Sequence, residues 1–380
     1  MAQSFNGFSV CLIVLACSFP ANGQHAEPTK HNSLGVSYQA GYVFGTNRFL
    51  RGENREKEEI NFYQNASFKF GRQTDGSELW HRRYNFPFYG AGFHIADYNS
   101  PDEIGTPLTV FGFCSFPLRR WKSVSLIFDL EVGVSFNWKP YSIEHNPYNV
   151  AMGSNGQGYV GMGFFADYKL SNRWIMNAGV HFAHYSNGAI KRPNLGINAI
   201  SPKIILRYNL YENAINYNHR EVPEFDSQNE WTISMYAGEK EIITETVLDS
   251  ILRFKREKHQ VFGLATAYHR KISYKSKFGI GTSISYDGSN NSADSVWTDN
   301  LQWSIFPSYE LDVGKFTVII QPGFYLVRKQ TLFDSEKWYQ RVGFKYHVHE
   351  NLFVGVNVRA FYFSTADYLE WNLGYRIKWH

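Results

Sequence analysis

The sequence predicts an all-β fold, a transmembrane antiparallel β-barrel of about sixteen strands. Aromatic residues make up 17% of the 380 residues and 31 residues are glycine, which is high for a soluble domain. Beyond the N-terminal segment, no stretch approaches the ~20 consecutive apolar residues that a transmembrane helix needs. Several segments instead alternate apolar and polar residues, as membrane strands do when every second side chain faces lipid.

The N-terminal segment, residues 1–23, is typical of a secretory signal peptide. An apolar run from Phe8 to Phe19 precedes Ala21 and Gly23, which are small residues at the −3 and −1 positions of a cut after Gly23. A cut before Cys17, as in a lipoprotein signal, remains an alternative. Either cut implies that the chain is exported.

The net charge and the cysteine content give little information about the function. After the signal the only cysteine is Cys114, so an intramolecular disulfide framework is excluded. The net charge of +4 is mild and gives no reason to expect a nucleic acid partner. The sequence contains no cluster with the spacing of metal ligands, so we expect no cofactor and no metal.

The clearest strand runs from Ser123 to Trp138, where apolar and polar residues alternate throughout. The last segment, Leu369 to Trp379, repeats the pattern and resembles the closing strand of bacterial outer-membrane barrels, although His380 rather than an aromatic residue ends it. Taken in order, the expected strands lie near 33–46, 60–71, 85–98, 106–118, 123–138, 157–170, 173–187, 197–211, 230–239, 259–271, 275–287, 301–312, 315–328, 337–347, 351–363 and 368–379.

The connections between these strands support a barrel. With the N-terminus in the periplasm, the connections after odd strands should be the longer, extracellular loops. The long polar connections are indeed 139–156, 188–196, 240–258 and 288–300, and the short ones are 171–172, 272–274, 313–314 and 348–350. The main exception is 72–84, which is long where a short turn is expected.

The chain divides into two halves. Residues 24–211 form a first half of eight strands, 212–229 a polar linker, and 230–380 a second half of eight strands. The sequence is compatible with one barrel of about sixteen strands or with an eight-strand barrel and an appended half. We favour the single barrel.

The residues that suggest chemistry lie between His184 and Asn198. In the strand near 173–187, His184 and Ser186 are in phase with Trp174, Met176 and Val180, which should face lipid. A polar pair on that face is costly unless it is satisfied or useful. Side chains two apart on a strand are ~6.5–7 Å apart at their bases, so a histidine can accept the serine's proton.

A base of this kind needs a third group to orient it. Asn198 is in phase with the lipid-facing residues of the next strand, unless a bulge at Pro202 shifts that phase by one. Donors for an oxyanion could come from Asn187 and Asn194 or from the backbone of Gly188 and Ala189, and Lys191 and Arg192 could meet a headgroup phosphate. Taken singly, these residues also fit an ordinary barrel rim and loop; their joint occurrence favours a site.

The run His184-Tyr185-Ser186-Asn187, followed by Lys191-x-Pro193-Asn194-x-Gly196, resembles the signature of the outer-membrane lipid A 3-O-deacylases, or acyloxyacyl hydrolases. The resemblance covers residues 33–211. The matching segments are similar to those of longer, two-part members of the family from Bacteroidetes-type bacteria. It implies that His184 and Ser186 are catalytic. The family's triad carboxylate falls at Asn198, so an amide replaces the acid here.

The resemblance further implies hydrolysis of an ester-linked acyl chain of lipid A, in the outer membrane of a Gram-negative bacterium, with the active site at the extracellular leaflet. Lipopolysaccharide and outer-membrane lipids would then be the partners. The second half has Phe361-Tyr362-Phe363-Ser364 near the end of strand fifteen, without a histidine. We therefore expect one active site per chain.

Two other functions remain open. Outer-membrane phospholipase A also has His-x-Ser-Asn and a triad Asn twelve residues after its serine, but that family lacks the Lys-x-Pro-Asn-x-Gly run, needs calcium and dimerises. A porin-like or structural barrel with a degenerate site is the non-enzymatic alternative. The inward charges Asp129, Glu131, Arg359 and Arg376 fit a channel or a plugged interior.

Overall fold

The computed structural model describes residues 31–211, 217, 222–248, 251–290, 296–329 and 336–380, so the expected signal peptide lies outside the described residues. The strands are β1 (Asn32–Val43), β2 (Phe62–Gln73), β3 (Phe88–Asp97), β4 (Gly105–Arg120), β5 (Val124–Trp138), β6 (Gln157–Lys169), β7 (Trp174–Ser186), β8 (Ile197–Asn209), β9 (Gln228–Leu248), β10 (Ile251–Lys271), β11 (Ser276–Asp287), β12 (Leu301–Val313), β13 (Phe316–Val327), β14 (Trp338–His347), β15 (Leu352–Phe361) and β16 (Thr365–Trp379). The helices are α1 (Leu79–Arg83) and the 3₁₀ helices η1 (Gly288–Asn290) and η2 (Trp297–Asn300).

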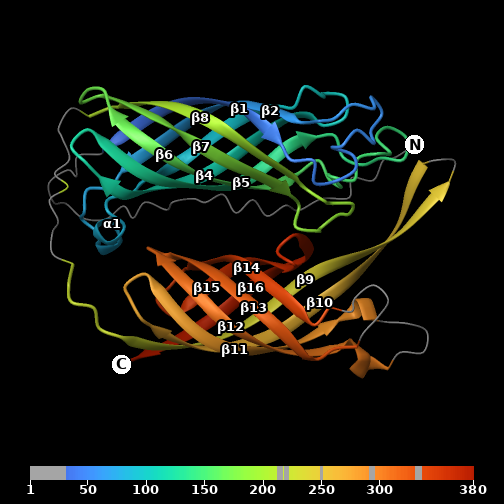
Figure 1. The fold of residues 1–380 in the computed structure, drawn as a ribbon. Coiled ribbons are helices and arrows are strands. Elements are labelled where there is room, and N and C mark those ends of the chain that lie inside the picture. Colours follow the sequence, from blue (N-terminus) through green and yellow to red (C-terminus); the bar gives the residue numbers. More distant parts are fainter. Residues whose placement is uncertain (1–30, 212–216, 218–221, 249–250, 291–295, 330–335) are drawn as a thin grey trace, which may run out of the picture.

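The strands form two closed antiparallel barrels, which we call the N-terminal barrel (β1–β8) and the C-terminal barrel (β9–β16) (Figure 1). The expected all-β barrel and its sixteen strands are confirmed. The preference for a single barrel was wrong, because β8 pairs back with β1 and β16 pairs back with β9. Alternation shows that a strand is half exposed to lipid, but not which distant strand closes the sheet.

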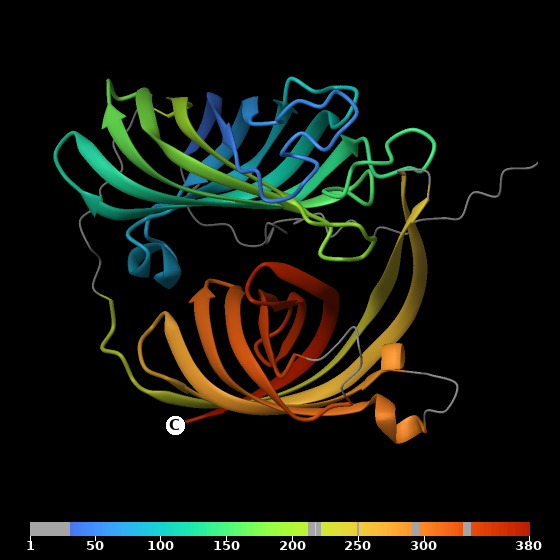
Figure 2. The ribbon, with the colours of Figure 1, turned by 45° about the vertical axis from the view of Figure 1, so that its right-hand side comes forward.

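Most strand boundaries agree with the sequence to within three residues. The exceptions are β9 and β10, because the expected loop 240–258 is strand on both sides of its turn. Pairing of β9 with β16 stops at Ala237 and pairing of β10 with β11 starts at Val261. Residues 238–248 and 251–260, which we call the β9–β10 hairpin, therefore extend beyond the barrel wall and reach the loop end of the N-terminal barrel (Figures 1 and 2).

The interior of the N-terminal barrel is filled by paired charges. Glu131 lies 2.8 Å from the ammonium of Lys69 and 2.9 Å from that of Lys203. Lys69 also contacts Asp129 at 2.7 Å, and the hydroxyl of Tyr159 donates to Glu131 at 2.5 Å. Buried charges are tolerated only when they are paired and hydrogen-bonded. The charged side chains inside this barrel meet that condition by pairing with one another.

The C-terminal barrel uses the same kind of interior. Glu310 pairs with Lys277 at 2.9 Å and also with Lys345, and Glu370 holds Arg341 at 2.6 Å and Arg359 at 2.7 Å. The inward charges of both barrels are therefore buried and paired. The sequence was compatible with either a channel or a plugged interior, and the described residues form a plugged interior.

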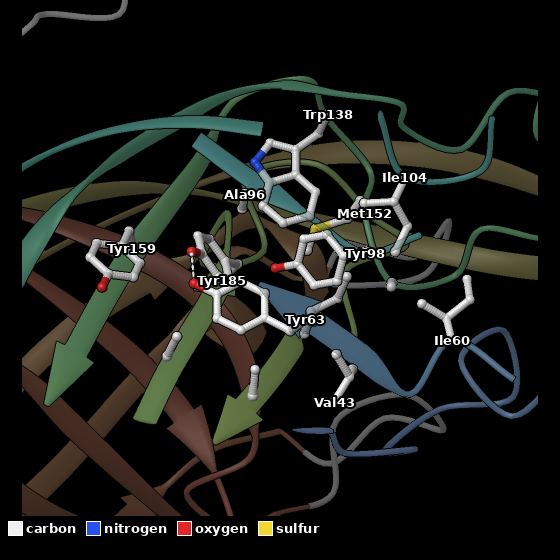
Figure 3. Packing of buried hydrophobic residues seen from close by; sticks show 14 of the residues in the cluster. Val43, Ile60, Tyr63, Ala96, Tyr98, Ile104, Trp138, Met152, Tyr159 and Tyr185 are labelled. Carbon is white, nitrogen blue, oxygen red and sulfur yellow. Dashed lines mark hydrogen bonds between the residues drawn. The ribbon is translucent and has the colours of Figure 1, made fainter. Parts of the chain in front are cut away.

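An aromatic cluster closes the loop end of the N-terminal barrel (Figure 3). Tyr185 of β7 is fully buried in it. The Tyr185 hydroxyl lies 3.2 Å from the hydroxyl of Tyr63 and 2.8 Å from Nε2 of His94. Because side chains alternate along a strand, this inward anchor fixes its two sequence neighbours on the outer face.

The connection 72–84 is long because it carries α1, which contacts the other barrel at the short-turn end of the molecule. The hydroxyl of Tyr84 donates to the carbonyl of Asp312 at 2.5 Å, and the guanidinium of Arg83 lies 3.6 Å from the ring centre of Tyr274.

Within the part of the chain that the structure covers, no helix has the length and hydropathy needed to cross a bilayer.

Candidate active site

His184 and Ser186 lie at the loop end of β7, on its outer face. Both are partly buried, and they alternate with the buried Ala183 and Tyr185. Asn198 lies on the outer face of the neighbouring β8, directly opposite His184 in the strand register. The pairing of β7 with β8 runs through Pro202 without a shift, so the three side chains share one face of two adjacent strands, as their phases predict.

The imidazole of His184 is oriented by the amide of Asn198. Its Nδ1 lies 2.7 Å from Oδ1 of Asn198. Because an amide oxygen only accepts hydrogen bonds, Nδ1 carries the hydrogen and donates it. The lone pair is then on Nε2, which is the tautomer that a general base for a hydroxyl requires.

The hydroxyl of Ser186 sits among hydrogen-bond donors. Its Oγ accepts the backbone N–H of Gly188 at 3.1 Å and Nδ2 of Asn194 at 2.8 Å. Among the described residues, no hydrogen bond joins Ser186 to His184. The two side chains flank Gly196, since a Cβ there would lie 3.3 Å from Cε1 of His184 and 3.7 Å from Cβ of Ser186.

The loop after β7 is held in one conformation by its own polar groups. Asn187 donates from Nδ2 to Oγ of Ser154 at 2.9 Å and to the carbonyl of Lys191 at 2.8 Å, and its backbone N–H donates to Oδ1 of Asn194 at 3.1 Å. Of the residues expected to supply oxyanion donors, Gly188 and Asn194 thus approach Ser186, whereas Asn187 organises the loop. Ala189 is buried with a φ of 65°.

Arg192 contacts the C-terminal barrel. Its backbone N–H donates to the carboxylate of Glu241, and its guanidinium donates to the carbonyl of Ala366 at 3.3 Å and lies 3.9 Å from the carboxylate of Asp367. Sequence reasoning missed these partners, because nothing local to Arg192 indicates a contact with residues 174 positions away.

The C-terminal barrel contacts the loop that follows β7. A Cβ added to Gly188 would lie 2.8 Å from Cγ and Cδ2 of Leu369, which belongs to β16. This apolar side chain therefore contacts the backbone that donates to Ser186. The site lies where the two barrels meet.

One group of metal-ligand types occurs in the described residues, away from this site. The possible ligand atoms of Glu230, His269 and Glu310 lie within 4.8 Å of one another inside the C-terminal barrel. Lys277 contacts both carboxylates, at 3.2 Å and 2.9 Å. Since ammonium groups already neutralise these carboxylates, the arrangement is that of a buried ion-pair network.

Solved structures with some likeness to the chain include outer-membrane proteins. Three are the Acinetobacter baumannii protein Omp33 (8% identity, 93% of this chain and 100% of that chain, TM-score 0.17), a deletion mutant of the TodX monoaromatic hydrocarbon channel (7%, 92% and 90%, 0.20), and the siderophore receptor PirA from Pseudomonas aeruginosa (8%, 93% and 82%, 0.20). At these TM-scores they bear on neither the fold nor the function. No curated protein matches the chain.

Two family models match the chain, one on each barrel. Residues 64–208 match lipid A 3-O-deacylase (PagL), and residues 229–379 match the C-terminal domain of acyloxyacyl hydrolase. The first match includes His184, Ser186 and Asn198. Together the two matches cover most of the sequence between residues 64 and 379, and the chain belongs to the lipid A 3-O-deacylase (acyloxyacyl hydrolase) family of the outer membrane.

Proposed function

We propose that the chain is a serine esterase that removes an ester-linked acyl chain from lipid A in the extracellular leaflet of the outer membrane. The observation that carries the proposal is the 2.7 Å contact between Nδ1 of His184 and Oδ1 of Asn198, on the same outer face as Ser186. A barrel that only transports solutes has no use for an oriented base and a donor-bound hydroxyl on its outer face, whereas a lipid hydrolase needs both there.

In the first step Oγ of Ser186 attacks the ester carbonyl while Nε2 of His184 takes the hydroxyl proton. The Nδ1–H of His184 stays on Asn198. The amide keeps the ring in the correct tautomer, but it carries no negative charge to stabilise the imidazolium. A serine with this third group should work, although it is less activated than one with a carboxylate.

The negative charge then develops on the carbonyl oxygen, which is bonded to the same carbon as Oγ. The N–H of Gly188 and Nδ2 of Asn194, which bind Oγ at 3.1 Å and 2.8 Å, are the donors nearest to that oxygen. Donors fixed before the reaction stabilise such an oxyanion without reorganisation. Their position on a loop bound to its own side chains favours this role.

Collapse of the tetrahedral intermediate breaks the ester C–O bond, and the leaving sugar or acyl hydroxyl receives the proton from His184. Water then attacks the acyl-enzyme, with His184 again as the base, and releases a free fatty acid and the original Ser186. The reaction consumes one water and needs no oxidant or reductant.

Mass spectrometry of lipid A from cells that express the chain tests this function. The wild type and Ser364→Ala, a matched serine change in the C-terminal barrel, should each remove one acyl chain, whereas Ser186→Ala should leave lipid A intact. Identical lipid A in all strains, with or without the chain, would contradict the proposal.

Phospholipase activity is the second candidate, because an asparagine rather than a carboxylate orients His184. The same cells distinguish it. Ser186-dependent release of lysophospholipid, abolished by a calcium chelator and with lipid A unchanged, would assign the site to phospholipids instead.

A further inference from the structure

The β9–β10 hairpin brings the cation of Arg256 to the N-terminal barrel. The guanidinium lies 5.5 Å from the ring centre of Tyr141, which belongs to the loop between β5 and β6. A cation at this distance from an aromatic face is attracted to it. Figure 2 shows the hairpin rising from the C-terminal barrel towards these loops.

Lys191, five residues after Ser186, precedes Arg192, whose backbone N–H donates to Glu241 of the same hairpin. Burial lowers the pKa of Lys191; the positive charges of Arg256 and Lys258 lower it further, against the opposing charge of Glu241. All three of these neighbours belong to the hairpin. Positive charges from both barrels therefore converge beside the loop that donates to Ser186.

The nearby carboxylates are already engaged. Glu239 pairs with Lys258, and Glu241 accepts the backbone N–H of Arg192. In the part of the chain that the structure describes, neither Lys191 nor Arg256 forms an ion pair. Among those residues, no acceptor meets the buried Nε and Nη2 of Arg256 either.

Two partly desolvated cations that form no ion pair among the described residues are costly, and a bound anion would lower that cost. Arginine matches a phosphate through two donors in a fixed plane, and lysine adds a point charge. We propose that Lys191 of the N-terminal barrel and Arg256 of the C-terminal barrel together bind a phosphate of lipid A beside Ser186, so that both barrels recognise the substrate. This rests on the proposed function.

Lys191 and Arg192, the two basic residues of the loop, then have different roles. Arg192 donates to the carbonyl of Ala366 and lies 3.9 Å from Asp367, so we assign it to the contact between the barrels rather than to the phosphate. The C-terminal barrel then has a function at the site although it has no catalytic pair of its own, because it supplies half of the anion site.

Binding in the full-length Ser186→Ala protein tests the proposal without turnover. The probes are bisphosphorylated lipid A and its dephosphorylated form, each in detergent micelles. Arg256→Gln and Lys191→Gln should each raise the Kd for the phosphorylated form about tenfold, as expected for a lost charge-assisted contact, and should not change the Kd for the dephosphorylated form. Arg270→Gln, at the opposite end of β10, is the matched control and should bind as the parent does.

Unchanged binding of phosphorylated lipid A in both variants would overturn the proposal. An equal dependence of phosphatidylglycerol binding on Arg256 would overturn the assignment to lipid A, since a bulk phospholipid would then be the source of the phosphate. Hydrolysis by the Ser186→Ala protein would instead refute the proposed function, and the binding comparison would still decide the phosphate site.

Discussion

The two barrels have the same kind of interior. In the N-terminal barrel Glu131 contacts two lysines and lies 3.4 Å from Nε2 of His181. In the C-terminal barrel Glu310 contacts two lysines and lies 3.2 Å from Nε2 of His269. These groups come from different strand positions, so the likeness is one of chemistry rather than of register. The interior of each barrel provides stability.

The outer faces at the loop ends are different. The N-terminal barrel has His184 and Ser186 at the end of β7, whereas the turn after β15 in the C-terminal barrel carries Tyr362 and Phe363, which are 70% and 71% exposed. These apolar side chains suit a surface in lipid, and they offer no base. The fold is therefore built twice in this chain, whereas the proposed catalytic segment, His184 to Asn198, occurs in the N-terminal barrel.

The largest expected effect on kcat distinguishes a histidine of the N-terminal barrel, His184, from one of the C-terminal barrel, His349. His184→Ala should lower kcat by on the order of 10⁴, as loss of a catalytic base does in other serine hydrolases. His349→Ala, on an exposed turn of the C-terminal barrel, should leave kcat unchanged. Hydrolysis of lipid A by the purified proteins measures both, and equal rates for the two variants would contradict the difference between the barrels.

The interior networks should matter equally in both barrels. Among the described residues, Glu131→Ala removes the carboxylate partner of Lys203 and Glu310→Ala removes that of Lys345. Each change should lower the free energy of unfolding by about 3–5 kcal/mol. Urea unfolding in vesicles measures this loss. Should only one of them destabilise the protein, the two interiors would not be equivalent.

Within the N-terminal barrel, substitutions of Asn198 test whether this residue orients His184. Asn198→Ala removes the acceptor for Nδ1 of His184 and should lower kcat about 100-fold, while Asn198→Asp adds a charge that stabilises the imidazolium and should raise kcat about tenfold. Steady-state kinetics of the three proteins tests this. A kcat that is indifferent to both changes would mean that Asn198 does not orient His184.

The smallest expected effect compares two glycines with positive φ. Gly196, with φ +71°, lies beside His184, and Gly314, with φ +60°, lies in a turn of the C-terminal barrel. Each change to alanine should cost about 1–2 kcal/mol of stability through backbone strain. Only Gly196→Ala should also reduce kcat, about tenfold, since its Cβ would lie 3.3 Å from Cε1 of His184. Equal kcat values for the two variants would show that the space beside His184 is not critical.

Local pattern predicted most of the fold and the position of the site. The alternation in the segment that became β5 identified a membrane strand, and the phase of β7 placed His184 and Ser186 on the outer face. Asn198 followed from the phase of β8. These features depend on residues close in sequence, which a period of two describes directly.

Long-range contacts were not predictable in the same way. Closure into two barrels depends on pairs such as Ser33 with Asn209, and no local pattern distinguishes this pairing from other possible strand pairings. In sequence the segment 240–258 resembles a loop, but residues 238–248 pair with residues 251–261 as a hairpin. The contacts of Arg192 with Ala366 and Asp367 were not predictable either, because both partners lie in the other barrel.

The most direct test of the central claim is covalent labelling of the purified protein with a serine-directed lipid phosphonate, followed by peptide mass spectrometry. If Ser186 is the nucleophile, one adduct should form, on Ser186; it should disappear in His184→Ala and be unaffected by Ser364→Ala. Absence of any adduct in the wild type, or an adduct on a serine of the C-terminal barrel, would contradict it.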